Sequence, residues 1–318
     1  MAIGVAANGT TSELKPEHRN VFGAFFTVAA YFYFFWVLGI QTIAFMINAN
    51  QYDAMKDSGY SAFFLYSIDY NEPLSLLKTY KAYDSLPMRL LINLSCLSLF
   101  AILHSALARP FIKRLMPIVG TESKYGVYNR GFYVFQSSLT WHLLIAAWQP
   151  LYFWSAPEDK DEPLSHIEVW GTYPQMLIGY FLGYAWMMSS TFALDHFDLC
   201  GLKQAFNIDF MAKMGAPLPE DKLTERAHYA LCRHPIMFGI LILFFCVPKM
   251  TLNHLVFSVA CSTYIFFAVT FLEEPDMESF FPEEYPDYKK RVPMFCPFTN
   301  GFPVSMPISV EAGKEKTK

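Results

Sequence analysis

Charged residues are scarce in this 318-residue chain. Asp, Glu, Lys and Arg make up 16% of the sequence, against about 25% in soluble domains, whereas 53% of residues are hydrophobic and 18% aromatic. The mean hydropathy is +0.23. This composition excludes an ordinary soluble domain and predicts an integral membrane protein whose main partner is the lipid bilayer. The net charge of −4 is small and gives no reason to expect a nucleic-acid partner.

Cysteine pairs are also missing. The six cysteines are scattered, mostly in apolar stretches, and no Cys-x-x-Cys sequence occurs. A disulfide framework is therefore not expected, and we predict buried thiols and no metal site. The N-terminus lacks a basic segment followed by a short apolar core, so the first apolar run is predicted to be an anchor, not a cleaved signal.

Six apolar stretches define the predicted fold, an all-α polytopic membrane bundle with about six passages, the last two forming a tight hairpin. They cover residues 21–47, 89–108, 128–149, 174–194, 236–247 and 254–272. Polar tails are expected at residues 1–20 and 299–318. The fifth stretch is short, since about 20 residues are needed to cross ~30 Å of hydrocarbon. It must recruit residues before Pro235 or cross only part of the bilayer.

Basic residues divide unequally between the two sides that six passages would create. The side carrying both termini would hold all but six of the 24 Lys and Arg residues. The six exceptions are Lys56, Lys78, Lys81, Arg89, Lys160 and Lys249. The positive-inside rule then predicts that both termini face the cytosol. The sequence leaves open which membrane holds the chain.

Two polar clusters flank the last hairpin. Arg233 and His234 stand before Pro235, a residue suited to the first turn of a helix, and a helix N-terminus attracts anions. Glu273 and Glu274 close the returning helix, where carboxylates are costly without a partner. Antiparallel helices would bring both clusters together. Adjacent helical residues point about 100° apart, so at most one glutamate is expected to face inward. The plainer alternative is a snorkelling arginine with a capping histidine, and a helix that has reached water.

Together the clusters form a site with both signs of charge. Tyr285, Tyr288 and Arg291 follow within reach of a tail that folds back. Such a site suits a ligand that carries a carboxylate, an ammonium or sulfonium group, and an aromatic base.

These residues resemble the C-terminal region of membrane-embedded S-adenosylmethionine methyltransferases, the class that includes isoprenylcysteine carboxyl methyltransferase. The matching elements are Arg-His-Pro at 233–235 with Gly239, then Glu-Glu at 273–274, then Tyr285, Tyr288 and Arg-Val-Pro at 291–293. Two positions depart from the pattern: Met237 replaces a tyrosine and Pro282 replaces a glycine.

A narrower resemblance extends upstream. The segments 104–110, 128–150, 196–204 and 248–252 look like those of bacterial methanethiol S-methyltransferases, and the likeness covers roughly residues 90–298. Nurim, a nuclear-envelope membrane protein, shares the elements at 201–204 and 233–235. The resemblance implies a membrane methyltransferase-like domain over residues 21–298, with the cofactor region at 226–298.

The resemblance also implies an enzyme that uses S-adenosyl-L-methionine and methylates a small thiol such as methanethiol. The cofactor carboxylate would lie at Arg233 and His234, its ammonium or ribose at one glutamate, and its adenine under the tyrosines. Arg291 would help to close the tail. The full expected cofactor-binding set is Arg233, His234, Pro235, Gly239, Glu273, Glu274, Tyr285, Tyr288 and Arg291.

The thiolate is methylated faster than the thiol, and the pKa of a thiol is ~8.5. A nearby histidine or cation would therefore raise the fraction of thiolate. His196, His104 and Asp198 are the candidate catalytic residues. Each has a plainer alternative: His104 as a packing residue within a span, and His196 with Asp198 as a contact that ties down a loop.

Two other functions stay open at this stage. One is a nurim-like protein of the nuclear envelope or endoplasmic reticulum without established activity. The other is a methyltransferase that acts on a lipidated cysteine or a lipid. The sequence does not decide the oligomeric state.

Overall fold

The computed structural model describes residues 20–49, 66–69, 85–116, 118–120, 123, 125–151, 168–171, 173–217, 222–297 and 299. Its regular structure is almost entirely helical, as predicted. One addition is a short antiparallel pair of strands, β1 (Glu168–Trp170) and β2 (Met250–Thr251). The predicted polar tails and most of the loops at 48–88 and 150–173 lie outside the described residues.

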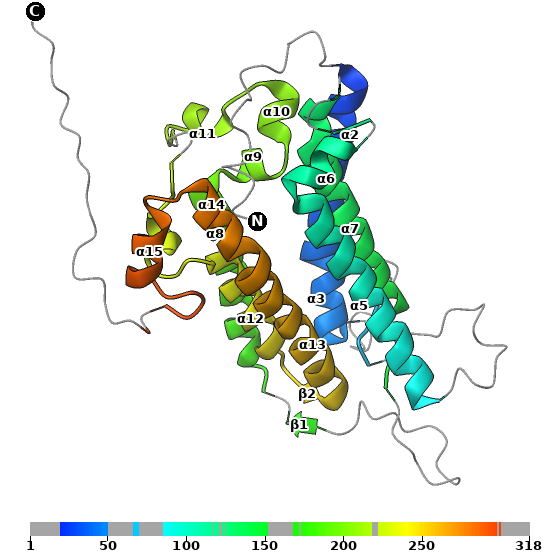
Figure 1. Cartoon of the computed structure of the whole chain (residues 1–318). Helices are drawn as coiled ribbons and strands as arrows, with labels where there is room; N and C mark the ends of the chain where they lie inside the picture. Colours follow the sequence, from blue (N-terminus) through cyan, green and yellow to red (C-terminus); the bar gives the residue numbers. More distant parts are fainter. Residues whose placement is uncertain are drawn as a thin grey trace, which may run out of the picture.

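The first half of the chain forms one group of long helices. Helix α7 lies against both α2 and α5, and the three run side by side (Figure 1). The elements are α2 (Val21–Phe35), a π-helical turn (Trp36–Gln41), α3 (Thr42–Ile47), α5 (Leu86–Ala108), α6 (Pro110–Leu115), a 3-10 turn (Gly126–Tyr128) and α7 (Asn129–Ala147).

The second half forms another group, built on the pairing of α8 with α12 (Figure 1). Its elements are α8 (Met176–Leu194), α9 (His196–Leu199), α10 (Leu202–Phe206), α11 (Phe210–Lys213), a 3-10 turn (Ala227–Ala230), α12 (Pro235–Phe245), α13 (Leu252–Ala268), a π-helical turn (Val269–Glu273), α14 (Glu274–Phe280) and α15 (Tyr285–Arg291).

Glycine allows α8 and α12 to approach closely. A Cβ atom on Gly239 would lie 2.7 Å from Met187 Cβ and 2.8 Å from the Met187 backbone nitrogen. Gly183 meets Ile242 in the same way, at 2.7 Å. Because residue numbers rise along α12 as they fall along α8, the two helices are antiparallel.

Four helices within the described part of the chain are long and apolar enough to cross a membrane. They cover Val21–Ile47, Leu86–Ala108, Met176–Leu194 and Leu252–Phe280. Their outward faces carry large exposed apolar side chains such as Phe22, Leu94, Leu182 and Phe271, as lipid-facing surfaces do. The structure therefore shows a helical membrane protein. Helices α7 and α12, which the count of six passages also needs, do not meet both criteria.

Helix α12 is too short to span ~30 Å of hydrocarbon by itself. It begins at Pro235 and recruits no earlier residue, so its 11 residues extend about 16 Å. The Trp186 indole N–H donates to the Pro235 carbonyl at 3.1 Å, which ties the first turn of α12 to α8.

A buried polar network holds the opposite end of the hairpin. Asp69 accepts hydrogen bonds from Asn48 at 2.8 Å and from Thr251 at 2.9 Å, and lies 3.4 Å from His254 Nδ1. The side chains of Asp69 and His254 are each 1% exposed. These contacts fix the tip of the last hairpin to the end of the first span, so the hairpin presents its other end in one position.

Candidate functional site

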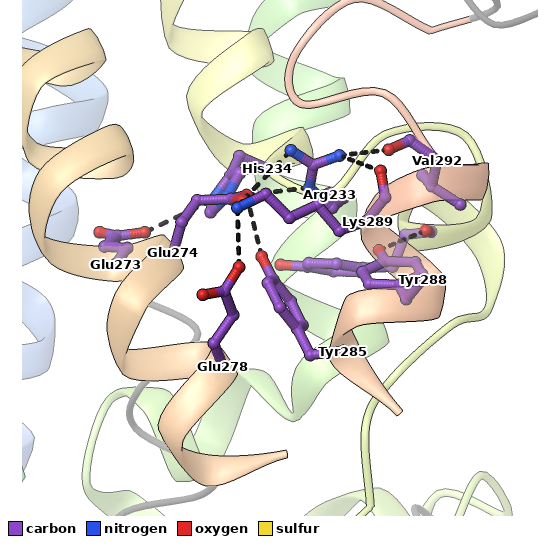
Figure 2. Close-up of polar contacts among 10 residues, drawn as sticks. Arg233, His234, Glu273, Glu274, Glu278, Tyr285, Tyr288, Lys289 and Val292 are labelled. Atoms are coloured by element: carbon purple, nitrogen blue, oxygen red, sulfur yellow. Dashed lines mark hydrogen bonds and ion pairs between the residues drawn. The ribbon is translucent and has the colours of Figure 1, made fainter. Parts of the chain in front are cut away.

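The candidate site lies where α12 begins. The backbone N–H groups of Arg233 and His234 donate to the carbonyls of Pro293 at 2.8 Å and Met294 at 3.0 Å. The tail after α15 thus folds back onto the start of α12, as the sequence predicted. The two polar clusters meet there, which confirms the prediction from antiparallel helices (Figure 2).

Both glutamates contact His234. Its Nε2 atom lies 2.8 Å from Glu274 Oε1, and its Nδ1 atom lies 3.4 Å from Glu273 Oε2. The expectation that at most one glutamate faces inward is therefore wrong. The helix widens into a π-helical turn at Val269–Glu273, and the imidazole lies between the two carboxylates, so each reaches a different ring nitrogen. Such π-helical turns occur frequently at functional sites.

Glu274 is the centre of the cluster. Its carboxylate accepts from Arg233 Nε at 2.9 Å, Arg233 NH2 at 3.2 Å, His234 Nε2 at 2.8 Å and the Tyr285 hydroxyl at 2.9 Å, and lies 3.3 Å from Lys289 Nζ. A carboxylate offers about four acceptor sites. The side chain is only 2% exposed, so the protein itself fills its hydrogen-bonding capacity.

Arg233 is committed to the protein in the same way. Besides its two bonds to Glu274, its NH1 atom donates to the carbonyls of Lys289 and Val292 at the C-terminal end of α15. A cation that caps the last carbonyls of a helix stabilises that end. The guanidinium thus joins α12, α14 and α15, and Figure 2 shows it between Glu274 and Val292.

Tyr285 and Tyr288 are buried beside this pair, with 1% and 2% exposure. The Tyr288 hydroxyl donates to the Tyr229 carbonyl at 2.6 Å, which ties α15 to the 3-10 turn before α12. Burial raises the pKa of both phenols, so they stay protonated and act as hydrogen-bond donors at neutral pH.

A pocket opens next to these groups. Its lining residues are Leu194, Lys222, Leu223, Thr224, Tyr229, Arg233, His234, Met277, Phe281, Tyr285 and Tyr288. Sequence reasoning found four of them and missed the segment 222–224, Tyr229 and the apolar wall. The only available signal was the basic and hydroxyl-bearing run just before the Arg-His-Pro element, which has no motif of its own.

Five of the nine expected cofactor-binding residues do not line the pocket: Glu273 and Glu274 belong to the charged cluster beside it, and the other three lie elsewhere. Arg291 lies outside the pocket, with its side chain 49% exposed, and binds Asp287 at 2.8 Å and Glu225 at 2.9 Å. Gly239 is at the contact with α8, and Pro235 forms the first turn of α12. These positions give them roles in packing and in fixing the backbone around the pocket.

His196 and Asp198 are held by contacts of their own. The His196 Nδ1 atom lies 2.7 Å from Thr191 Oγ1 and its Nε2 atom 3.1 Å from the Tyr31 hydroxyl, and the ring stacks on Phe192. Burial lowers the pKa of His196 to about 4, so the imidazole is neutral. Asp198 forms an ion pair with Arg130. Both residues fasten α9 against α2, α7 and α8.

His104 is on α5 and belongs to neither cluster. Its Nδ1 atom lies 3.0 Å from Ser137 Oγ, and the Tyr133 hydroxyl approaches its ring from α7. The structure therefore places the three expected catalytic residues in two separate regions.

His234 carries the most informative electrostatics of the pocket. Burial lowers the pKa of His234, but the hydrogen bonds and charges of Glu273 and Glu274 outweigh it and raise this pKa above its ordinary value. The imidazolium balances part of the negative charge of the two carboxylates. Among the described residues, no group of three or more His, Cys, Asp or Glu is arranged to hold a metal ion.

Comparison with known proteins places the chain among membrane methyltransferases. It is 37% identical over 213 residues to methanethiol S-methyltransferase 2 of Bradyrhizobium diazoefficiens, covering 65% of this chain and 73% of that protein. It is 32% identical over 209 residues to methanethiol S-methyltransferase of Mycobacterium tuberculosis, covering 65% and 78%.

A more distant similarity, 26% over 180 residues, links it to nurim of Xenopus laevis, covering 55% and 58%. No family model matches the chain. No solved structure matches it either. On the identity and coverage of the first relatives, the chain belongs to the methanethiol S-methyltransferase family.

Proposed function

We propose that this membrane S-methyltransferase moves the methyl group of S-adenosylmethionine to a small thiol such as methanethiol, which gives dimethyl sulfide. The observation that carries the proposal is the imidazole of His234 held between two buried carboxylates, beside a pocket walled by Tyr229, Tyr285 and Tyr288. The names of relatives at 37% and 32% identity supply the acceptor.

The pocket fits S-adenosylmethionine in its chemistry. Lys222 and His234 provide positive charge for a carboxylate, and Thr224 provides a hydroxyl. Apolar walls from Met277 and Phe281, with the tyrosines, suit an adenine ring. When bound, the cofactor supplies an electrophilic methyl group on a sulfonium sulfur.

The roles that we propose for these residues differ from those that the family pattern alone suggests. Arg233 and Glu274 bind each other and α15, so they hold the pocket in shape. Lys222, which lines the pocket, would meet the cofactor carboxylate, and His234 would add positive charge while its ring nitrogens stay on the two glutamates. Glu273, which contacts the other ring nitrogen at 3.4 Å, would take the cationic group of the cofactor. Transfer to a thiolate needs alignment of donor and acceptor and the exclusion of water, and the buried groups around the start of α12 would provide both.

The bilayer arrangement is part of the proposal. Six passages, of which α12 is a partial one, place both termini and the pocket on the cytosolic side, where S-adenosylmethionine is available to the chain. The excess of basic residues on that side supports this orientation.

The test is calorimetric titration of S-adenosylmethionine into the detergent-purified chain, with headspace detection of dimethyl sulfide from supplied methanethiol. We expect binding by the wild type and its loss, by tenfold or more, in His234→Ala and Glu273→Gln. Glu278→Gln is the matched control, because Glu278 lies one turn beyond Glu274, is 45% exposed and contacts Lys289. Unchanged binding in His234→Ala would reject the site.

The nurim-like alternative gives a different result. Its support is the 26% identity to nurim and the methionine at position 237. A folded wild-type chain that binds no S-adenosylmethionine would favour it. Cofactor binding with methylation of a prenylated cysteine, and none of methanethiol, would favour the lipid-directed alternative.

A further inference from the structure

A second polar cluster lies outside the pocket, on facing surfaces of α5 and α7. His104 Nδ1 lies 3.0 Å from Ser137 Oγ, and the Tyr133 hydroxyl lies 3.1 Å from His104 Nε2 and 3.3 Å from Nδ1. Phe100 stacks on the imidazole with 24° between the ring planes. A titratable side chain kept inside a membrane span is costly, and such residues are functional candidates by default.

The Tyr133 contact does not use the in-plane direction of Nε2. The two ring nitrogens point away from each other. The Tyr133 oxygen is almost equally far from them, 3.1 Å from Nε2 and 3.3 Å from Nδ1, so it cannot lie along the in-plane direction of either nitrogen. An in-plane oxygen at those distances would overlap the carbon between the nitrogens, so the hydroxyl lies over the ring face. Ser137 therefore fixes the ring through Nδ1, while the direction of Nε2 in the ring plane is one that Tyr133 does not occupy.

The end of α5, just beyond this cluster, adjoins the π-helical turn that carries Glu273. Ser105, the neighbour of His104, bonds the Tyr264 hydroxyl of α13 at 2.9 Å. One turn further along α5, Arg109 donates to the carbonyl of Leu272 at 3.2 Å and pairs with Asp276. Leu272 directly precedes Glu273 in the chain, so α5 lies alongside the glutamate at the level of the site.

Three groups on different helices, His104 on α5, Tyr133 on α7 and Tyr264 on α13, lie within electrostatic range of Glu273. The charge of Arg109 acts on the same three groups with the opposite sign. Figure 2 shows the Glu273 carboxylate directed at His234, on the opposite side of the imidazole from the guanidinium and the tyrosines of α15.

The other candidate proton acceptors are placed less favourably. Each ring nitrogen of His196 contacts its own hydroxyl, Thr191 at 2.7 Å and Tyr31 at 3.1 Å. Both nitrogens of His196 are therefore occupied, whereas in His104 the Tyr133 hydroxyl lies over the ring face. Asp198 is neutralised by Arg130. Neither is joined to the π-helical turn by a described contact, whereas α5 bonds Leu272 directly.

We propose that the wall formed by His104, Tyr133 and Ser137 is the acceptor side of the site, and that His104 Nε2 takes the thiol proton. This inference rests on the proposed function. As the S–H bond breaks, its electron pair stays on the thiol sulfur, and the proton moves to the imidazole. The sulfur then forms a bond to the methyl carbon, while the pair from the broken sulfonium–carbon bond returns to the cofactor sulfur. Glu273, which follows Leu272 at the contact with Arg109, is the carboxylate that would stabilise the resulting imidazolium.

The experiment compares two thiols of similar size in the wild type and His104→Ala. Ethanethiol needs a proton acceptor, whereas 2,2,2-trifluoroethanethiol is more acidic and is largely ionised without one. We expect kcat/KM for ethanethiol to fall about 100-fold or more in His104→Ala, and kcat/KM for the fluorinated thiol to fall less than about 10-fold. Equal losses for both thiols, or no loss for either, would overturn the role of His104.

Two further measurements complete the test. Ser137→Ala removes only the hydroxyl that orients the imidazole, so it should lower kcat/KM for ethanethiol less than His104→Ala does, with the same preference for the acidic thiol. If His104→Ala does not fold, Ser137→Ala takes its place in the test. Calorimetric binding of ethanethiol to protein saturated with S-adenosylhomocysteine should weaken in His104→Ala, while binding of S-adenosylmethionine stays unchanged. A wild type that binds the cofactor but methylates neither thiol would instead refute the proposed function.

Discussion

Removal of Glu274 is the sharpest test of how this site is built. Its carboxylate meets five donor atoms on four residues, and the substitution Glu274→Met would leave the Arg233 guanidinium buried with only the α15 carbonyls as partners. Breaking a buried ion pair by removing one partner costs about 3–5 kcal/mol. For a chain of this size that corresponds to a drop of roughly 5–10 °C in Tm.

The pairwise energy comes from a double-mutant cycle. Arg233→Met, Glu274→Met and the double variant are compared in one detergent by thermal unfolding followed through tryptophan fluorescence. Because the double variant leaves no unpaired charge, its loss should be smaller than the sum of the single losses by about 2 kcal/mol or more.

The matched control is Glu278→Gln, which removes a carboxylate one turn away that is 45% exposed and paired with Lys289. An exposed ion pair contributes about 0–1 kcal/mol, so this variant should unfold near the wild type. If Glu274→Met unfolds within 1 °C of Glu278→Gln, Glu274 is not the centre of the cluster and the reasoning fails.

Four further predictions follow from the contacts. The carboxylates of Glu273 and Glu274 raise the pKa of His234, so the stabilisation from the imidazolium is complete below about pH 6.5 and is lost as the pH rises through the raised pKa. The Tm difference between wild type and His234→Gln should therefore shrink above pH 6.5. A constant difference would contradict this prediction. Glu273→Gln should weaken S-adenosylmethionine binding in calorimetry while lowering the Tm less than Glu274→Met does, since Glu273 does not hold Arg233. Gly239→Ala places a methyl group 2.7 Å from Met187 Cβ and should cost about 1–3 kcal/mol by thermal unfolding, with an unchanged Tm as the contrary result. Asp198→Ala should lower the Tm through its lost ion pair but retain kcat/KM for ethanethiol within about threefold, and a 100-fold loss would restore Asp198 as a catalytic candidate.

The composition and the apolar pattern were enough to identify a helical membrane protein, because lipid requires backbone groups to be paired within each segment. They were less reliable for the number of passages. Helix α7 buries Asn129, Arg130 and Gln136. Asn129 donates to the Val119 carbonyl and Arg130 pairs with Asp198 of α9. Such polar positions lower its hydropathy, and only packing explains them.

The position of the site was also readable from the sequence. Arg233 and His234 precede one apolar helix, Glu273 and Glu274 follow the next, and a tight hairpin places the two ends together regardless of side-chain detail. The returning tail with Tyr285 followed from the same order. The prediction that at most one glutamate faces inward was wrong. It assumed a regular α-helix with about 100° between adjacent residues, and no local sequence pattern indicated the π-helical turn at Val269–Glu273.

The sequence by itself determined the class of protein, the hairpin and the residue types that gather at its end, since these depend on apolar length and on order along the chain. The tertiary structure alone decided which of those residues bind each other and which face a ligand. Arg233 and Glu274 neutralise each other, Arg291 lies outside, and Arg109 binds the π-helical turn, because each partner comes from a helix that only the fold brings near.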